Sequence, residues 1–66
     1  MEITLQELKD RAKAGSLRFT DRNNNPISVE QACKTPIMCR VHSANNTFDL
    51  YYKDMSGEVF LLIVES

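Results

Sequence analysis

The longest apolar run of the chain, Val59–Val64, restricts the fold more than any other sequence feature. It has six residues, which is the length of a strand, whereas a helix needs about 20 to cross a bilayer. Successive side chains of a strand point to opposite faces, so this strand is apolar on both. Such a strand is normally covered on both sides. We therefore expect a short helix, a second subunit or a partner to cover its second face.

Length and composition indicate one small domain. The chain has 66 residues, of which 42% are apolar, so we expect a single domain over residues 1–66 with a core. A domain of this size buries only about 60% of the surface of its unfolded chain, and its stability is marginal. Its two cysteines, Cys33 and Cys39, do not form the disulfide framework of a secreted protein.

The N-terminal segment has the sequence signals of a helix start. Thr4 is a good N-cap, and Glu7 follows it at the spacing of a capping box. Ile3 before the cap and Leu8 inside the helix form the matching hydrophobic staple. These signals predict a helix from Leu5 to Ala14.

The middle of the chain predicts a strand and a second helix. Residues 17–20 alternate apolar and polar side chains, as a short strand does. Ser28 and Gln31 repeat the capping-box spacing, which predicts a helix over residues 29–34. The alternative to the start of this helix is a strand over residues 27–30 that pairs with residues 17–20.

The C-terminal half predicts a three-stranded meander. A two-residue type I′ turn at Asn45-Asn46 pairs Val41 with Leu50 on an apolar face. It also pairs His42 with Asp49 on the opposite, mostly polar face. A carboxylate next to a histidine raises the histidine pKa. We therefore expect a raised pKa for His42 and a modest contribution of this pair to stability.

A four-residue loop over residues 54–57 sets the register of the second hairpin. It places Val59 beside Tyr52 and Leu61 beside Leu50, and leaves Phe60 on the second face. The fold class is α+β: an N-terminal helix packed on a small antiparallel sheet, with a C-terminal three-stranded meander and a second short helix. The predicted core consists of Leu5, Leu8, Ala12, Leu17, Phe19, Ile37, Cys39, Val41, Phe48, Leu50, Tyr52, Val59, Leu61 and Ile63.

No pattern in the sequence predicts a catalytic, metal or cofactor site. Cys39 and His42 have a Cys-x-x-His spacing, but residues three apart on a strand point to opposite faces and cannot ligate one ion. Gly15 and Gly57 stand alone, so there is no glycine-rich phosphate loop. We expect a protein without enzymatic activity, metal or cofactor.

The second sheet face is the predicted functional surface. We expect a small protein-interaction module (an inhibitor, adaptor or accessory subunit) that binds through this face, with Phe60 as the central anchor. Association of two copies into a homodimer is the alternative form of the same contact. The predicted partner-binding residues are Met38, Arg40, Tyr51, Phe60 and Leu62.

A nucleic-acid-binding accessory protein is the alternative function. Its phosphate contacts would come from Lys9, Arg11, Lys13, Arg18, Arg22 and Arg40. The net charge of −1 and the scattered basic residues do not give the positive field typical of such proteins. The N-terminus has no signal-peptide pattern, so we expect a cytoplasmic protein that does not insert into a membrane.

Overall fold

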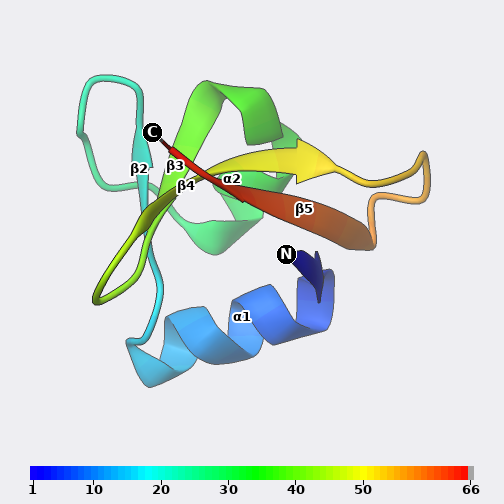
Figure 1. The fold of residues 1–66 in the computed structure, drawn as a ribbon, viewed down its shortest axis with the longest axis horizontal. Coiled ribbons are helices and arrows are strands. Elements are labelled where there is room, and N and C mark those ends of the chain that lie inside the picture. Colours follow the sequence, from blue (N-terminus) through cyan, green and yellow to red (C-terminus); the bar gives the residue numbers. More distant parts are fainter. Residues whose placement is uncertain (66) are drawn as a thin grey trace.

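The computed structural model describes residues 1–65 and has an α+β fold, as predicted (Figure 1). Its strands form a single antiparallel sheet in the order β1-β5-β4-β3-β2. In chain order the elements are β1 (Glu2–Thr4), α1 (Leu5–Ala14), β2 (Arg18–Asp21), α2 (Val29–Lys34), the 3-10 helix η1 (Pro36–Met38), β3 (Cys39–His42), β4 (Thr47–Tyr52) and β5 (Val59–Val64).

Helix α1 begins and ends where the sequence predicts. The Glu7 backbone N–H donates to Thr4 Oγ1 at 3.1 Å, and the Thr4 hydroxyl donates to the Glu7 carboxylate at 3.3 Å. Gly15 ends the helix with a φ of 82°, a left-handed conformation that glycine adopts without strain. Ile3 and Leu8 are both buried in the core, which fits the predicted staple.

Replacing Thr4 by alanine is expected to lower the free energy of unfolding by about 1 kcal/mol, the usual cost of a lost N-cap. The substitution leaves the Glu7 backbone N–H without the Thr4 hydroxyl as its acceptor. Chemical denaturation of the two proteins measures the difference. The Thr4→Ser variant keeps the hydroxyl and is expected to stay within a few tenths of a kcal/mol of the original. Equal stability of Thr4→Ala and the original chain would contradict this cap.

Strand β1 was not predicted, and it changes the place of β5 in the sheet. Ile3 pairs with Phe60, and the Met1 backbone is hydrogen-bonded to the Leu62 backbone in both directions at 2.7 Å. β5 therefore lies between β1 and β4 instead of at an edge. Sequence patterns miss β1 because three residues that lead directly into a helix are too few to show an alternation.

The segment between β2 and α2 contains parts of both predicted alternatives. Pro26 forms an isolated bridge with Thr20, and the Ile27 backbone N–H donates to the Phe19 carbonyl at 3.1 Å. The chain therefore returns briefly along β2 before Ser28 caps α2. The Gln31 backbone N–H donates to Ser28 Oγ at 3.1 Å, as predicted.

The register of the first hairpin differs from the predicted one by two residues. Arg40 pairs with Asp49, and His42 pairs with Thr47, so the predicted His42–Asp49 pair is wrong. The reason is the turn: Ser43 Oγ accepts the Asn46 backbone N–H, while the Ser43 N–H donates to the Asn46 carbonyl. This turn does not use the positive φ angles of a type I′ turn, since within residues 1–65 only Asn24 and glycines have them. A two-residue shift keeps each side chain on its face.

The register of the second hairpin differs by one residue, which exchanges the two faces of β5. Leu50 pairs with Leu62, and Tyr52 pairs with Phe60. The Lys53 N–H donates to the Val59 carbonyl at 3.0 Å, so the loop holds residues 54–58 and is one residue longer than predicted. Local hydrogen bonds build this loop, because Ser56 bonds to Asp54 and accepts from the Glu58 backbone N–H. The predicted four-residue loop did not take these side-chain hydrogen bonds into account.

The one-residue shift corrects the predicted core. Phe60 is fully buried and Leu62 nearly so, whereas Ile63 is 48% exposed and Val59 and Leu61 are half-buried. Ile37 is also exposed, because η1 precedes β3 and the strand begins only at Cys39. The buried core consists of Ile3, Leu8, Leu17, Phe19, Ala32, Cys39, Val41, Leu50, Phe60 and Leu62.

Candidate protein-binding face

The sheet has one face toward the helices and one face, here called the outer face, that points away from the core. Leu8 of α1 and Ala32 of α2 belong to the same buried cluster as Leu50 and Leu62, so both helices pack on the inner face. By strand alternation the outer face carries the other residues of each strand. Its members on the three central strands are Val59, Leu61, Ile63, Thr47, Asp49, Tyr51, Arg40 and His42.

Charged side chains of the chain itself lie across the outer face of β5. Lys53 Nζ is 2.7 Å from Glu2 Oε1. Lys53 directly follows β4 and Glu2 belongs to β1, and β5 lies between these two strands in the sheet. The ion pair therefore crosses over β5 near Val59 and Leu61, which are only half-buried. A lysine side chain covers apolar surface with its methylene groups while its ammonium group stays in water.

Two further ion pairs cross the other central strands in the same way. Arg40 Nε of β3 lies 3.5 Å from Glu65 Oε1, which follows β5, and this pair spans β4. Arg22 Nη2, just after β2, lies 3.5 Å from Asp49 Oδ1 of β4, and this pair spans β3. Arg22 also donates to the Ile37 carbonyl at 2.9 Å. Each of the three central strands is thus crossed by one ion pair between its two neighbours.

The apolar side chains between these ion pairs remain accessible. Tyr51 is 39% exposed and Ile63 is 48% exposed. Tyr51 pairs with Leu61, and Ile63 pairs with Asp49, so Tyr51 and Ile63 are diagonal neighbours on adjacent strands. An aromatic and an aliphatic side chain therefore lie exposed between charged pairs on this face.

The structure brings two of the five predicted partner-binding residues onto this face, Arg40 and Tyr51. Phe60 and Leu62 lie in the core instead, because the one-residue shift of β5 turns them inward. Met38 is 62% exposed at the end of η1, beyond the last β3–β4 pair, and lines a separate hollow of about 350 Å³.

Sequence reasoning missed Leu61 and Ile63 as outer-face residues. The only signal for them was that β5 is apolar on both faces, so either of its two side-chain sets could be the exposed one. The loop length decides between the two sets, and the exposed one here includes Ile63.

His42 lies at the polar end of the outer face. Its Nε2 is 2.7 Å from Thr20 Oγ1, and its Nδ1 is 3.4 Å from Thr47 Oγ1. Burial lowers the pKa of His42 below its usual range, and the positive charges of Arg18 and Arg40 lower it further, against a weaker raising effect of Glu65. The expected raised pKa is therefore wrong, because the predicted carboxylate partner Asp49 lies opposite Arg40.

Acidification is expected to destabilise the fold through His42. A lowered folded-state pKa means that the unfolded chain binds the proton more tightly, so stability rises with pH. The contribution is fully present above the unfolded value of about 6.5 and is lost as pH falls through 6.5 toward the lower folded value. Unfolding curves between pH 7.5 and 5 measure this loss, and the His42→Gln variant is expected to lack it. An NMR titration with a His42 pKa above 6.5 would contradict the account.

The two cysteines are free thiols in an unreactive setting. Burial raises the pKa of Cys33 and that of Cys39 each to about 11. The Cys39 thiol donates to the Pro36 carbonyl at 3.2 Å. Both thiols therefore stay protonated at neutral pH. The reactive form of cysteine, which attacks as a nucleophile or binds a metal, is the thiolate. Over residues 1–65, the structure groups no three His, Cys, Asp or Glu side chains at one metal-binding position.

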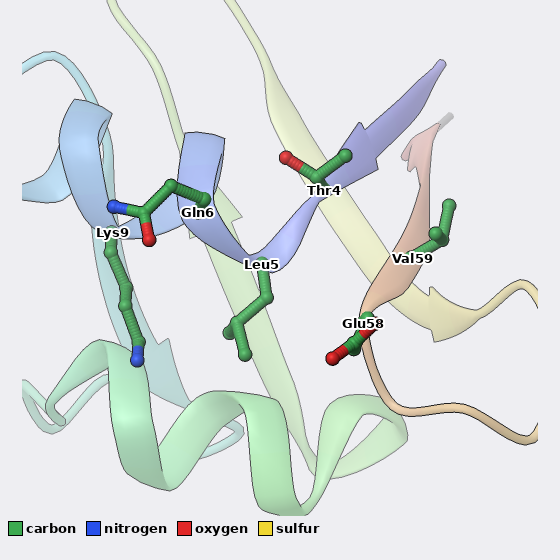
Figure 2. A pocket seen from close by; sticks show the side chains of 6 residues that line it. All are labelled: Thr4, Leu5, Gln6, Lys9, Glu58 and Val59. Atoms are coloured by element: carbon green, nitrogen blue, oxygen red, sulfur yellow. The ribbon is translucent and has the colours of Figure 1, made fainter.

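A hollow of about 290 Å³ lies where α1 begins and β5 starts. Figure 2 shows the side chains that line it. The Leu5 side chain lies between Lys9 of α1 and Glu58, which precedes β5 (Figure 2). Leu5 and Lys9 also line a neighbouring hollow of about 240 Å³ that reaches Cys33. The hollow is open to solvent, and Thr4, Gln6 and Val59 complete its lining.

The predicted nucleic-acid contacts are spread over α1 and the outer face. Three of the six basic residues are in ion pairs: Arg22 with Asp49, Arg40 with Glu65, and Arg11 with Glu7 at 3.9 Å. Lys9 and Lys13 lie on α1, and Arg18 lies on β2. Neighbouring carboxylates therefore offset much of the positive charge on the outer face.

In the part of the chain that the structure describes, no helix has the length and apolar character needed to span a membrane. Comparisons of the chain with protein-family models, with curated proteins and with solved structures give no match.

Proposed function

We propose that this chain is a small, non-enzymatic protein-interaction module that binds a protein partner through the outer face of its sheet. The observation that supports this most is the β4–β5 register, which puts Tyr51, Leu61 and Ile63 together on the face opposite the helices. Arg40 borders this group, and arginine and tyrosine are enriched where proteins bind one another.

The arrangement supports recognition of a surface that is mainly apolar. The ion pairs on the outer face offset its charges within the chain, although Arg40 Nε and Asp49 Oδ1 are buried there without a hydrogen bond. Burial of Tyr51 and Ile63 supplies the free energy, at roughly 25 cal/mol for each Å² of apolar surface removed from water. The charged pairs around them fix the orientation of the partner.

Immobilised chain is expected to retain a protein from an extract of the cells that produce it, and the Ile63→Lys variant is expected to lose that protein. Met55→Lys is the matched control, because Met55 is fully exposed at the tip of the β4–β5 loop. Loss of the protein with both variants, or with neither, would contradict binding through the outer face.

A salt titration separates this function from nucleic-acid binding. Phosphate contacts make affinity fall steeply as salt rises, whereas an apolar interface responds little. We expect the retained protein to stay bound between 50 and about 300 mM salt, and random DNA or RNA to bind only at the low end. Tight, steeply salt-dependent binding of random nucleic acid would support the nucleic-acid function instead.

A further inference from the structure

We propose that the outer face binds a second copy of this chain, giving a symmetric dimer in which two sheets pack face to face. This inference rests on the proposed function and names the partner of the same face. The protein is small enough that packing against another copy is a common source of additional burial. Tyr51 and Ile63 are the side chains that gain most, because they are 39% and 48% exposed in the single chain.

Each end of the apolar row carries an ion pair, and a two-fold axis places each pair against the other pair of the partner copy. Beyond Val59 the row ends at the ion pair of Lys53 with Glu2, and beyond Ile63 it ends at Glu65, which is paired with Arg40. The two-fold axis lies in the plane between the two sheets, is perpendicular to the strands and passes between Leu61 and Ile63. It exchanges these two ends. It places Leu61 over the partner's Ile63 and Lys53 near the partner's Glu65, and each contact occurs twice.

The same axis gives the polar side chains suitable neighbours. Asp49 and Tyr51 are on the same strand, one on each side of the axis, so Tyr51 faces the partner's Asp49 and lies near the partner's Arg40. A tyrosine can donate its hydroxyl to a carboxylate, and its ring can accept a guanidinium group. The face therefore matches itself in charge as well as in apolar area.

The area of the face predicts a weak dimer. The two longer extents of the molecule are 27 and 23 Å. These extents limit the buried area to roughly 1,200 Å² over both copies, the lower end of specific interfaces. We expect a dissociation constant on the order of 10–100 μM, which corresponds to a reversible monomer–dimer equilibrium.

Sedimentation equilibrium from 10 μM to 1 mM tests the proposal with the chain alone. The average mass is expected to rise from 7.6 kDa toward twice that value for the original chain and for Met55→Lys. For Ile63→Lys it is expected to stay at the monomer mass, with an unchanged circular dichroism spectrum. Dissociation by Met55→Lys, or persistence of the dimer in Ile63→Lys, would overturn the proposed surface.

A charge exchange tests the two-fold arrangement itself. Lys53→Glu and Glu65→Lys are each expected to weaken self-association at least tenfold, because each puts like charges together twice. An equimolar mixture of the two variants is expected to associate more tightly than either variant alone, since both intermolecular contacts are then of opposite charge. The intrachain pairs with Glu2 and Arg40 stay broken in both variants. A mixture no tighter than either variant alone would overturn the arrangement. A chain that stays monomeric at 1 mM would overturn the dimer, while retention of a different protein by the outer face would still support the proposed function.

Discussion

Replacing Phe60 by serine is expected to unfold the chain. Phe60 is fully buried between β1 and β4, where it pairs with Ile3 and Tyr52, and its ring centroid lies 5.3 Å from that of Tyr52. Removing a buried phenylalanine ring costs about 3–5 kcal/mol, and the serine hydroxyl adds a buried polar group. Since a small domain has roughly that much stability in total, most molecules would be unfolded at 25 °C, as circular dichroism measures.

A residue on the opposite face of β5 is the matched control. Ile63 is on the outer face and is 48% exposed, so Ile63→Ser is expected to cost no more than about 1 kcal/mol and to keep the fold. A sequence-based assignment of Phe60 to the exposed face predicts the opposite order. Melting of Phe60→Ser like the original chain, together with unfolding of Ile63→Ser, would show that Ile63 and not Phe60 lies on the inner face of β5.

Replacing Leu8 by alanine is expected to have the second-largest effect. Leu8 is the one residue of α1 that is fully buried, so it holds the helix on the inner face of the sheet. Leucine-to-alanine substitutions in cores cost about 2–5 kcal/mol, the sum of lost burial and a cavity. Thermal unfolding is expected to show a large decrease in melting temperature.

Leu5 provides the comparison within the same helix. It is half-buried at the edge of the hollow in Figure 2, so Leu5→Ala is expected to cost clearly less than Leu8→Ala. Equal effects of the two substitutions would show that α1 does not pack through Leu8.

The parts of the fold that follow from local signals were predictable from the sequence. The capping residues Thr4 and Ser28 act within one helical turn, and both helices begin where these residues predict. The inner-face residues of β3 were predictable as well. The predicted β3–β4 register is wrong by two residues, and a two-residue shift leaves Cys39 and Val41 on the same face.

The candidate site was only partly predictable, because it depends on the length of one loop. Hydrogen bonds of Asp54 and Ser56 add a fifth residue to the β4–β5 loop, and this single residue exchanges Phe60 with Ile63 between core and surface. Because β5 is apolar on both faces, its sequence gives no penalty for either choice. Arg40 and Tyr51 lie on strands whose faces were assigned correctly, and for that reason they remain in the candidate site.

The ion pairs that cross the central strands could not be predicted from the sequence either. Lys53 and Glu2 are far apart in the chain, and their contact requires β1 to lie beside β5. A three-residue strand has no pattern that predicts its partner strand. The position of β1 beside β5, and the ion pair that crosses β5, are therefore known only from the structure.

The β4–β5 register decides which side chains of β5 are exposed, and cross-strand NMR contacts measure it directly. The Lys53–Val59 hydrogen bond makes Leu50–Leu62 and Tyr52–Phe60 the closely spaced, non-hydrogen-bonded pairs, with Cα atoms about 4.5 Å apart. We predict strong Hα–Hα nuclear Overhauser effects for these two pairs. Strong effects between Leu50 and Leu61 and between Tyr52 and Val59 would contradict the account, because that register turns Phe60 and Leu62 to the outer face.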